Sequence, residues 1–308
     1  MKVGLFANAS EELPIEPLLR SLSDNGINAS LYRVRESWRG MSIAHIRANL
    51  GEVSHLVLWA RDRLPPQTWS SLLAGYAIGT SKGLYVLAPA EVELEEYLEG
   101  FRRLETPERL AEELIGARSE YEHARQIDKA REELISSGFA LTEATLLEAV
   151  GQGNERAARN FLLLGYSPNA RDESGLPALF RAVRSGNLNV VRLLVDYGAD
   201  VNEQSGDRGT SPLMEAAGTG QVAVTRQLLE AGADPDMVST YGQSAAILAA
   251  SEGHADTLKL LLEWNARTDL VDHLGMTALK YATLFHHDEA AQALEVDYAG
   301  GGQYGYPR

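Results

Sequence analysis

One alanine recurs along the second half of this 308-residue chain at an almost constant interval. It stands at Ala149, Ala182, Ala216, Ala249 and Ala282, so successive members are 33, 34, 33 and 33 residues apart. A fixed period of this length is typical of stacked structural repeats, in which each unit buries its apolar face only against its neighbours. We therefore expect residues 141–295 to form a repeat array.

The sequence around each alanine repeats as well. A glycine lies seven residues before each of the last four alanines, and a Leu-Leu pair lies further on in the central repeats. These positions are Gly175, Gly209, Gly242 and Gly275, and Leu193-Leu194, Leu228-Leu229 and Leu261-Leu262. A glycine at a turn permits positive φ, alanines let neighbouring helices approach closely, and the leucines form the buried stripe of a second helix. The pattern predicts a helix–turn–helix unit in every repeat.

The segments at 211–216, 244–249 and 277–282 resemble the Thr-Pro-Leu-His-x-Ala signature of the ankyrin family. The resemblance implies an all-α solenoid with a capping repeat at 142–171, further repeats near 172–203, 204–236, 237–269 and 270–295, and a flexible tail at 296–308. One repeat departs from the signature, because Pro177 replaces the threonine that normally forms a local hydrogen bond. The last repeat is expected to stop near Leu294, after one and a half helices.

Ankyrin arrays bind their partners through the tips of the turns and the exposed side of the first helices. The resemblance therefore implies a protein-binding groove that is polar at one end and apolar at the other. The candidate residues are Arg184, Arg208, Tyr241, Gln243, Glu252, His273, Leu274, Met276, Leu284 and Phe285. The apolar members near the end of the array require a cover, which is either a partner protein or the tyrosine-rich tail.

The first 105 residues follow another pattern, in which short apolar runs alternate with segments of helical spacing. The runs at 2–7, 29–34, 55–60, 83–87 and 101–104 predict strands, and 13–25, 43–50 and 69–78 predict helices. This alternation favours a parallel sheet with helices on both faces. Residues 106–140 also have helical spacing, which predicts a bridging helix or a helix pair.

The first domain resembles the Toll/interleukin-receptor (TIR) domain and the related nucleoside deoxyribosyltransferases. The resemblance is carried by residues 3–10, 40–43, 54–59 and 69–79, and it implies a flavodoxin-like sheet. It also implies a ligand pocket, formed in this chain by Asn8, Ser10, Asp62, Trp69 and Leu73. Self-association of the TIR-like domain is a further hypothesis from the same resemblance.

One residue of the pocket departs from the catalytic pattern. Catalytic relatives carry a glutamate four residues after the tryptophan, where this chain has Leu73. A leucine cannot accept hydrogen bonds from a ribose or stabilise a positively charged transition state. We therefore expect a vestigial pocket without a catalytic residue or cofactor, in which Leu73 packs against Trp69, Tyr76 and the first strand.

Composition narrows the classes of partner. The chain has no cysteine, which excludes thiolate zinc sites, and the adjacent His286 and His287 point to different helix faces, so we expect no metal. Its net charge is −15, and residues 141–308 carry 22 acidic but only 12 basic side chains. An acidic surface repels phosphate backbones and anionic lipid, and no apolar stretch approaches the length of a spanning helix. We expect a cytoplasmic protein that binds neither nucleic acid nor membranes.

These observations favour a non-catalytic adaptor, in which the ankyrin groove holds a protein client and the TIR-like domain docks onto itself or another domain. Two alternatives belong to other classes. One is an enzyme that cleaves the N-glycosidic bond of NAD or a nucleoside with a relocated acid, for which Asp62, Glu11 and Glu12 are candidates. The other is a sensor, whose pocket binds a nucleotide without cleaving it and thereby changes how the array is presented.

Overall fold

The computed structural model describes residues 1–8, 15–34, 50–61 and 67–299. The chain divides into two compact units, Met1–Gln126 and Ile127–Arg308. Four predicted features lie outside the described residues: the loop at 40–43, most of the helix at 43–50, the candidate acids Glu11, Glu12 and Asp62, and the tail from residue 300 onward.

The N-terminal unit contains a five-stranded parallel sheet in the order β2-β1-β3-β4-β5. The strands are β1 (Lys2–Asn8), β2 (Asn28–Val34), β3 (His55–Trp59), β4 (Gly83–Leu87) and β5 (Arg102–Leu104). The prediction of a parallel α/β domain is therefore confirmed. Because β1 lies between β2 and β3, the direction of the strand order reverses at β1, and such a reversal is where open α/β sheets bind ligands.

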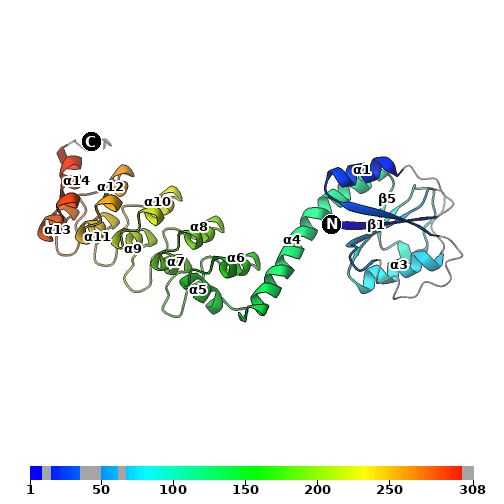
Figure 1. Ribbon diagram of the computed structural model, residues 1–308, viewed down its shortest axis with the longest axis horizontal. Coiled ribbons are helices and arrows are strands. Elements are labelled where there is room, and N and C mark those ends of the chain that lie inside the picture. Colours follow the sequence, from blue (N-terminus) through cyan, green and yellow to red (C-terminus); the bar gives the residue numbers. More distant parts are fainter. Residues whose placement is uncertain (9–14, 35–49, 62–66, 300–308) are drawn as a thin grey trace. The chain divides into compact units, whose positions relative to one another are not determined.

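Helices cover both faces of this sheet (Figure 1). On one face, α1 (Glu16–Asp24) and the first part of α4 (Pro107–Ser136) pack over Leu5 and its neighbours, whereas α3 (Gln67–Gly79) packs over Phe6 and Leu58. Successive residues of a strand point to opposite faces, so each strand supplies both layers of the core. A short turn of 3-10 helix, η1 (Glu96–Leu98), buries Leu98 in the layer beneath α3.

The predicted helical segment between the domains is one continuous helix, α4. Leu110 and Leu114 in its first half belong to the core of the sheet, and Leu134 near its end belongs to the core of the array. The segment at 106–140 therefore contributes to two hydrophobic cores, because apolar residues at helical spacing continue along its whole length.

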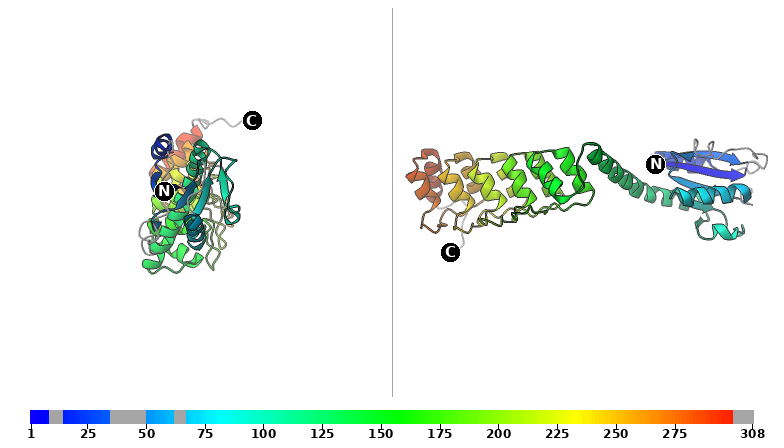
Figure 2. Two further views of the ribbon diagram at one scale, coloured as in Figure 1. Left: turned by 90° about the vertical axis from the view of Figure 1, so that its right-hand side faces the viewer. Right: turned by 90° about the horizontal axis from the view of Figure 1, so that it is seen from below.

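The C-terminal unit contains five helix pairs. They are α5 (Glu143–Gly151) and α6 (Glu155–Leu163), α7 (Ala178–Ser185) and α8 (Leu188–Asp196), α9 (Pro212–Gly218) and α10 (Val222–Glu230), α11 (Ala245–Ser251) and α12 (Ala255–Glu263), and α13 (Ala278–Leu284) and α14 (Asp288–Ala299). First helices pack beside first helices and second beside second, as Figures 1 and 2 show. The five periodic alanines are fully buried, which is what close packing of the first helices requires.

A hairpin turn precedes each of the last four helix pairs. In the turn at 172–176 the Asp172 N–H donates to the Leu176 carbonyl at 3.1 Å, and Gly175 has a φ of 76°. The equivalent turns span 205–210, 239–243 and 272–276, and each closes with the same type of backbone bond. The turn at 205–210 has one extra residue, which accounts for the single 34-residue interval between alanines.

In four of the five repeats, the side chain of the residue before the first helix caps that helix. The hydroxyls of Ser211, Ser244 and Thr277 each accept a hydrogen bond from the N–H three residues on, at 3.2–3.3 Å. Such a cap contributes about 1 kcal/mol. Thr142 caps α5 in the same way at 3.3 Å, whereas Pro177 before α7 provides no side-chain cap, as its sequence indicates.

The last repeat is longer than its sequence suggested. Its second helix, α14, continues to Ala299, beyond the predicted end of the repeat at residue 295. Ala290 and Leu294 are fully buried in the array core and hold the helix in place. The next helix-breaking residue is Gly300, so nothing in the sequence ends the helix earlier.

Candidate protein-binding surface

The hairpins and the first helices form one continuous side of the array, and hydrogen bonds connect the hairpins to one another. The Thr240 N–H donates to the carbonyl of Arg208, and the His273 N–H donates to that of Tyr241, both at 2.9 Å. The tips of the last three hairpins are therefore held in a fixed row by their own backbone.

Arg208, Tyr241 and Leu274 occupy the same place at the tips of successive hairpins, and all three are exposed. His273 is also exposed, whereas Gln243 and Met276, two residues after the tips, are half-buried. The remaining predicted groove residues lie at the ends of first helices, where all are exposed: Arg184, Glu252, Leu284 and Phe285. The ten residues thus lie along two edges of the side formed by hairpins and first helices.

This surface becomes apolar at the C-terminal end of the array. Leu274, Leu284 and Phe285 are 79%, 58% and 51% exposed. In the four preceding repeats the position of Leu284 holds Gly151, Arg184, Gly218 and Ser251, and that of Phe285 holds Gln152, Ser185, Thr219 and Glu252. Only the last repeat carries bulky apolar side chains at both positions, and exposed apolar clusters of this kind typically mark interaction sites.

The other end of the surface is polar and ion-paired. Arg184 at the end of α7 contacts Glu215 of α9 at 3.1 Å between Nε and Oε1, and its guanidinium also lies 5.2 Å from the centre of the Phe180 ring. Both contacts hold the arginine against the first helices. Its exposed edge remains available to an acidic group of a partner.

A carboxylate inside the last hairpin fixes the tip that carries Leu274. Asp272 accepts hydrogen bonds from the Tyr281 hydroxyl at 2.6 Å and from the N–H groups of Leu274 and Met276 at 2.9 Å. Burial opposes ionisation of Asp272, but these bonds outweigh it and lower the pKa of the carboxyl. Asp172 has the same role in the first hairpin, where bonds from Ser174 and Leu176 lower its pKa.

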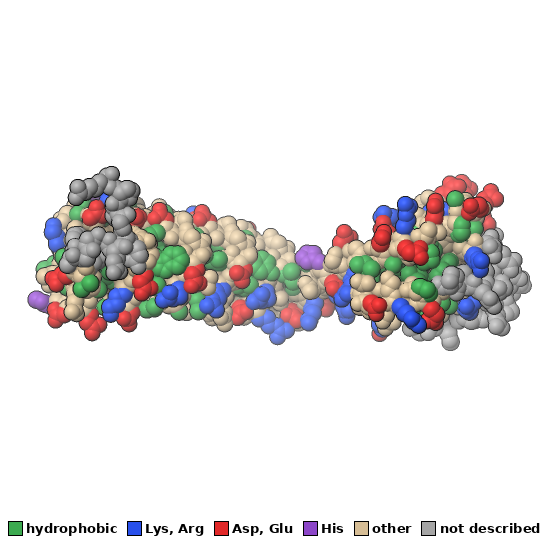
Figure 3. All heavy atoms as spheres, turned by 90° about the horizontal axis from the view of Figure 1, so that it is seen from above, with side chains coloured by type: hydrophobic (Ala, Val, Ile, Leu, Met, Phe, Trp, Pro, Cys, Tyr) green, Lys and Arg blue, Asp and Glu red, His purple; other side chains and the backbone are tan. Residues whose placement is uncertain are grey.

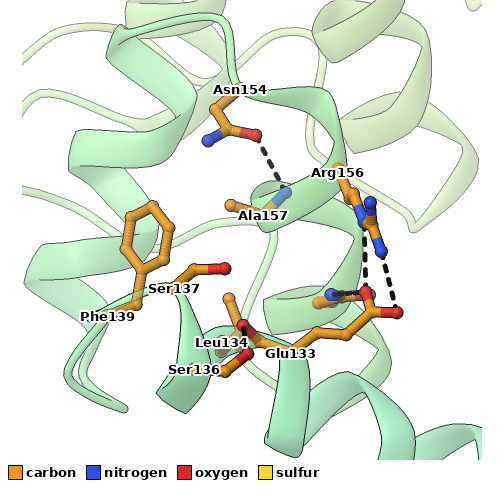
Figure 4. A pocket seen from close by; sticks show the side chains of 9 residues that line it. Glu133, Leu134, Ser136, Ser137, Phe139, Asn154, Arg156 and Ala157 are labelled. Carbon is orange, nitrogen blue, oxygen red and sulfur yellow. Dashed lines mark hydrogen bonds and ion pairs between the residues drawn. The ribbon is translucent and has the colours of Figure 1, made fainter.

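A cavity of about 230 Å³ lies where the end of α4 meets α6 (Figure 4). Glu133 accepts hydrogen bonds there from Arg156 at 3.1 Å and from Asn160 at 3.0 Å. The bond from Arg156, supported by Asn160, holds the pKa of Glu133 at about 2. The cluster joins α4 to the first repeat, and we interpret it as a structural clamp. The sequence analysis missed it, because Glu133 lies 23 residues from Arg156 and no local pattern connects them.

The predicted pocket of the N-terminal unit falls mostly outside the described residues, which include neither Ser10 nor Asp62, nor the side chains of Asn8 and Trp69. Leu73 is described and is fully buried. It lies in the same core cluster as Phe6 of β1, against which Tyr76 also packs. A buried leucine in this cluster contributes hydrophobic packing and cannot form a hydrogen bond to a ligand.

The described residues contain no group of three or more His, Asp or Glu side chains that could hold a metal ion. In the same part of the chain, no helix is both long enough and apolar enough to cross a membrane.

Paired helices that stack side by side and are preceded by hairpin turns define a solenoid repeat protein. The chain belongs to the ankyrin-repeat family: the family model for ankyrin repeats in three copies matches residues 146–239 and 223–299. An ankyrin repeat-containing protein of Treponema pallidum (strain Nichols) is 30% identical over 293 residues, which cover 93% of this chain and 97% of that protein. An alignment of this length includes most of the N-terminal unit as well.

Other relatives match only a third of the chain. Protein phosphatase 1 regulatory subunit 27 of Homo sapiens is 45% identical over 101 residues, or 32% of this chain and 65% of that protein. The B-cell lymphoma 3 protein homolog of Mus musculus is 35% identical over 104 residues, or 33% of this chain and 23% of that protein. Both matches are shorter than the array.

Proposed function

We propose that this chain is a non-catalytic adaptor whose ankyrin array binds a protein client through the hairpin tips and the exposed side of the first helices. The observation that carries the proposal is the apolar end of this surface, where the last repeat alone replaces small or polar residues with Leu284 and Phe285. Large apolar groups on a rigid support supply most of the free energy of a typical interface. A relative described as a phosphatase regulatory subunit is in keeping with such a role.

The side chains of this surface indicate which kind of client segment would bind to it. Near Leu274, Leu284 and Phe285 it offers apolar contacts, and near Arg184 and Arg208 it offers cations. A complementary segment has apolar anchors at one end and acidic residues at the other. Charges would set its orientation, and the apolar anchors would set its affinity.

For the N-terminal unit we propose a TIR-like, flavodoxin-like domain that has lost the chemistry of its relatives. The strand order and the burial of Leu73 at the position of the catalytic glutamate support this proposal. The domain limits at 1–105 and 141–295, the latter extended to Ala299 by α14, belong to the same proposal, as does a cytoplasmic location. An adaptor of this kind would use the sheet domain for docking and the array for the client.

Affinity capture with quantitative mass spectrometry tests the adaptor proposal. We expect proteins captured by the wild-type chain from its native cytoplasm to be lost when Leu274→Glu and Phe285→Glu are combined, because both changes place charges in the apolar contact. The matched control combines Val222→Glu and Val296→Glu, which add the same charges to exposed valines on second helices. If the control and the groove variant capture the same proteins as the wild type, the array does not bind its client through this surface.

A further inference from the structure

The second helices of the array carry charges at two repeated positions on their outward face. In α8, α10 and α12, which are nine residues long, the fifth residue is basic and the last is acidic. The basic row is Arg192, Arg226 and Lys259, and the acidic row is Asp196, Glu230 and Glu263; all six side chains are exposed. Since α8 packs beside α10 and α10 beside α12, each set forms a row along the array. Figure 3 shows Lys and Arg side chains along this side of the array, with Asp and Glu side chains next to them.

Most of these charged side chains form no ion pair within the described part of the chain. No ion pair among the described residues involves the acidic row, although each acid follows a base by four residues on the same helix. Arg192 donates to Gln227 at 2.8 Å, and Lys259 lies 3.6 Å from Asp256. Arg226 has no polar contact among the described residues. Five of the six charges therefore have no ion-pair partner among the described residues, and the sixth, Lys259, is exposed and pairs only with the exposed Asp256.

The rows are complementary to themselves. If a second copy is rotated by 180° about an axis that runs along the array between the two rows, the basic row of each copy faces the acidic row of the other. Arg192 then faces Asp196 of the partner subunit, and Arg226 faces Glu230 of the partner subunit. A rotation axis across the rows would instead place like charges together, so the pattern selects one of the two arrangements.

We propose that the chain self-associates through this face, with the second helices of two copies packed against each other around that axis. The pattern begins at α8, because α6 ends in Leu163 and its Arg159 is paired with Glu155 at 2.8 Å. It ends at α12, because the same positions of α14 hold Gln292 and Val296.

Two copies that each carry a net charge of −15 repel one another over most of their surface. The two rows carry three charges of each sign, and Asp256 adds one more acid on α12, so the net charge of this face is small and copies meet here with little repulsion. The interface lies on different helices from the client-binding surface, and neither proposal depends on the other.

Sedimentation velocity on the full chain tests the proposal. We expect a dimer at low salt that weakens as salt is added, because exposed ion pairs are screened. Combining Arg192→Glu with Arg226→Glu turns four of the six contacts repulsive and should weaken the dimer by at least about tenfold. Combining Asp196→Arg with Glu230→Arg should have the same effect. A chain with all four changes should dimerise again, and an equal mixture of the two double variants should form a mixed dimer.

The control combines Arg20→Glu with Arg125→Glu, which changes the net charge equally but alters exposed residues outside this face and outside the client-binding surface. It should dimerise like the wild type. The proposal is overturned if the wild type is monomeric at low salt, if the control loses the dimer as readily as the first double variant, or if the fourfold variant and the mixture both stay monomeric. Circular dichroism on each variant shows whether a lost dimer reflects lost folding.

Discussion

Leu73 is the residue on which the chemistry of the N-terminal unit depends. It is fully buried, whereas its neighbour Leu72 is 37% exposed on the same helix. Leu73→Glu would place a carboxylate in the apolar cluster that contains Phe6 and Leu58. We expect the unfolding free energy to fall by on the order of 3 kcal/mol or more, because an unpaired buried charge is costly, and we expect no release of nicotinamide from NAD.

Leu72→Glu is the matched control and should leave the melting temperature nearly unchanged. Both variants are measured by thermal unfolding and by incubation with NAD. A Leu73→Glu protein that melts like the wild type would show that the pocket is open. Steady nicotinamide release by it would show that the glutamate was all that the domain had lost, and the adaptor proposal would then have to include catalysis.

Because of Glu133, we expect the stability of the array to depend on pH in the acidic range. Its pKa is about 2 in the folded chain and 4.5 without these partners, so its contribution is complete above pH 4.5 and is lost as the pH falls toward 2. Glu133→Gln should therefore destabilise the array at neutral pH and flatten its pH dependence between about pH 4.5 and 2. Urea unfolding over this range measures both effects. Glu132→Gln is the control, since Glu132 is an exposed neighbour that forms no ion pair with any residue that the structure describes. A Glu133→Gln array with the slope of the wild type would show that the clamp does not stabilise the fold.

At the scale of elements, a glycine lets successive repeats stack closely. Gly253 follows α11 with a φ of 77°, and a Cβ built there would lie 2.6 Å from Nδ1 of His287 in the next repeat. That ring also contacts the Ser251 carbonyl at 3.0 Å from Nε2. Gly253→Ala should destabilise the array by about 2 kcal/mol, since it combines positive-φ strain with a displaced ring.

Gly198 separates these two causes, because its φ is 86° but nothing lies within 4 Å of a Cβ placed there. Gly198→Ala should cost only the backbone strain, about 1 kcal/mol. Adding His287→Ala should relieve Gly253→Ala of the steric part of its cost. Chemical denaturation of the three variants measures these differences, and equal losses at the two glycines would show that the ring does not restrict the stack.

At the scale of the whole molecule, the two units have hydrophobic cores with no residue in common. We therefore expect two unfolding transitions in calorimetry. Leu58→Ala should lower only the transition of the sheet domain, and Phe161→Ala only that of the array. Each change should cost about 3 kcal/mol, since both side chains are fully buried. If either variant shifts both transitions equally, the units unfold as one.

The sequence by itself determined the features that repeat or that act locally. The periodic alanines, the hairpin glycines and the caps at Ser211, Ser244 and Thr277 all follow from 33-residue spacing and short-range hydrogen bonds. The strands could be predicted equally well from the sequence, because a buried parallel strand is an apolar run between turns.

Only the tertiary structure decided which distant groups meet. It paired Glu133 with Arg156, placed the His287 ring over Gly253, and buried Leu73 beneath the sheet. It also aligned Arg192 and Arg226 in one row, by packing α8 beside α10. These contacts join residues that are tens of positions apart, and their geometry depends on how whole helices pack. Periodicity reports which face of a helix is buried, but it does not report which side chain lies opposite.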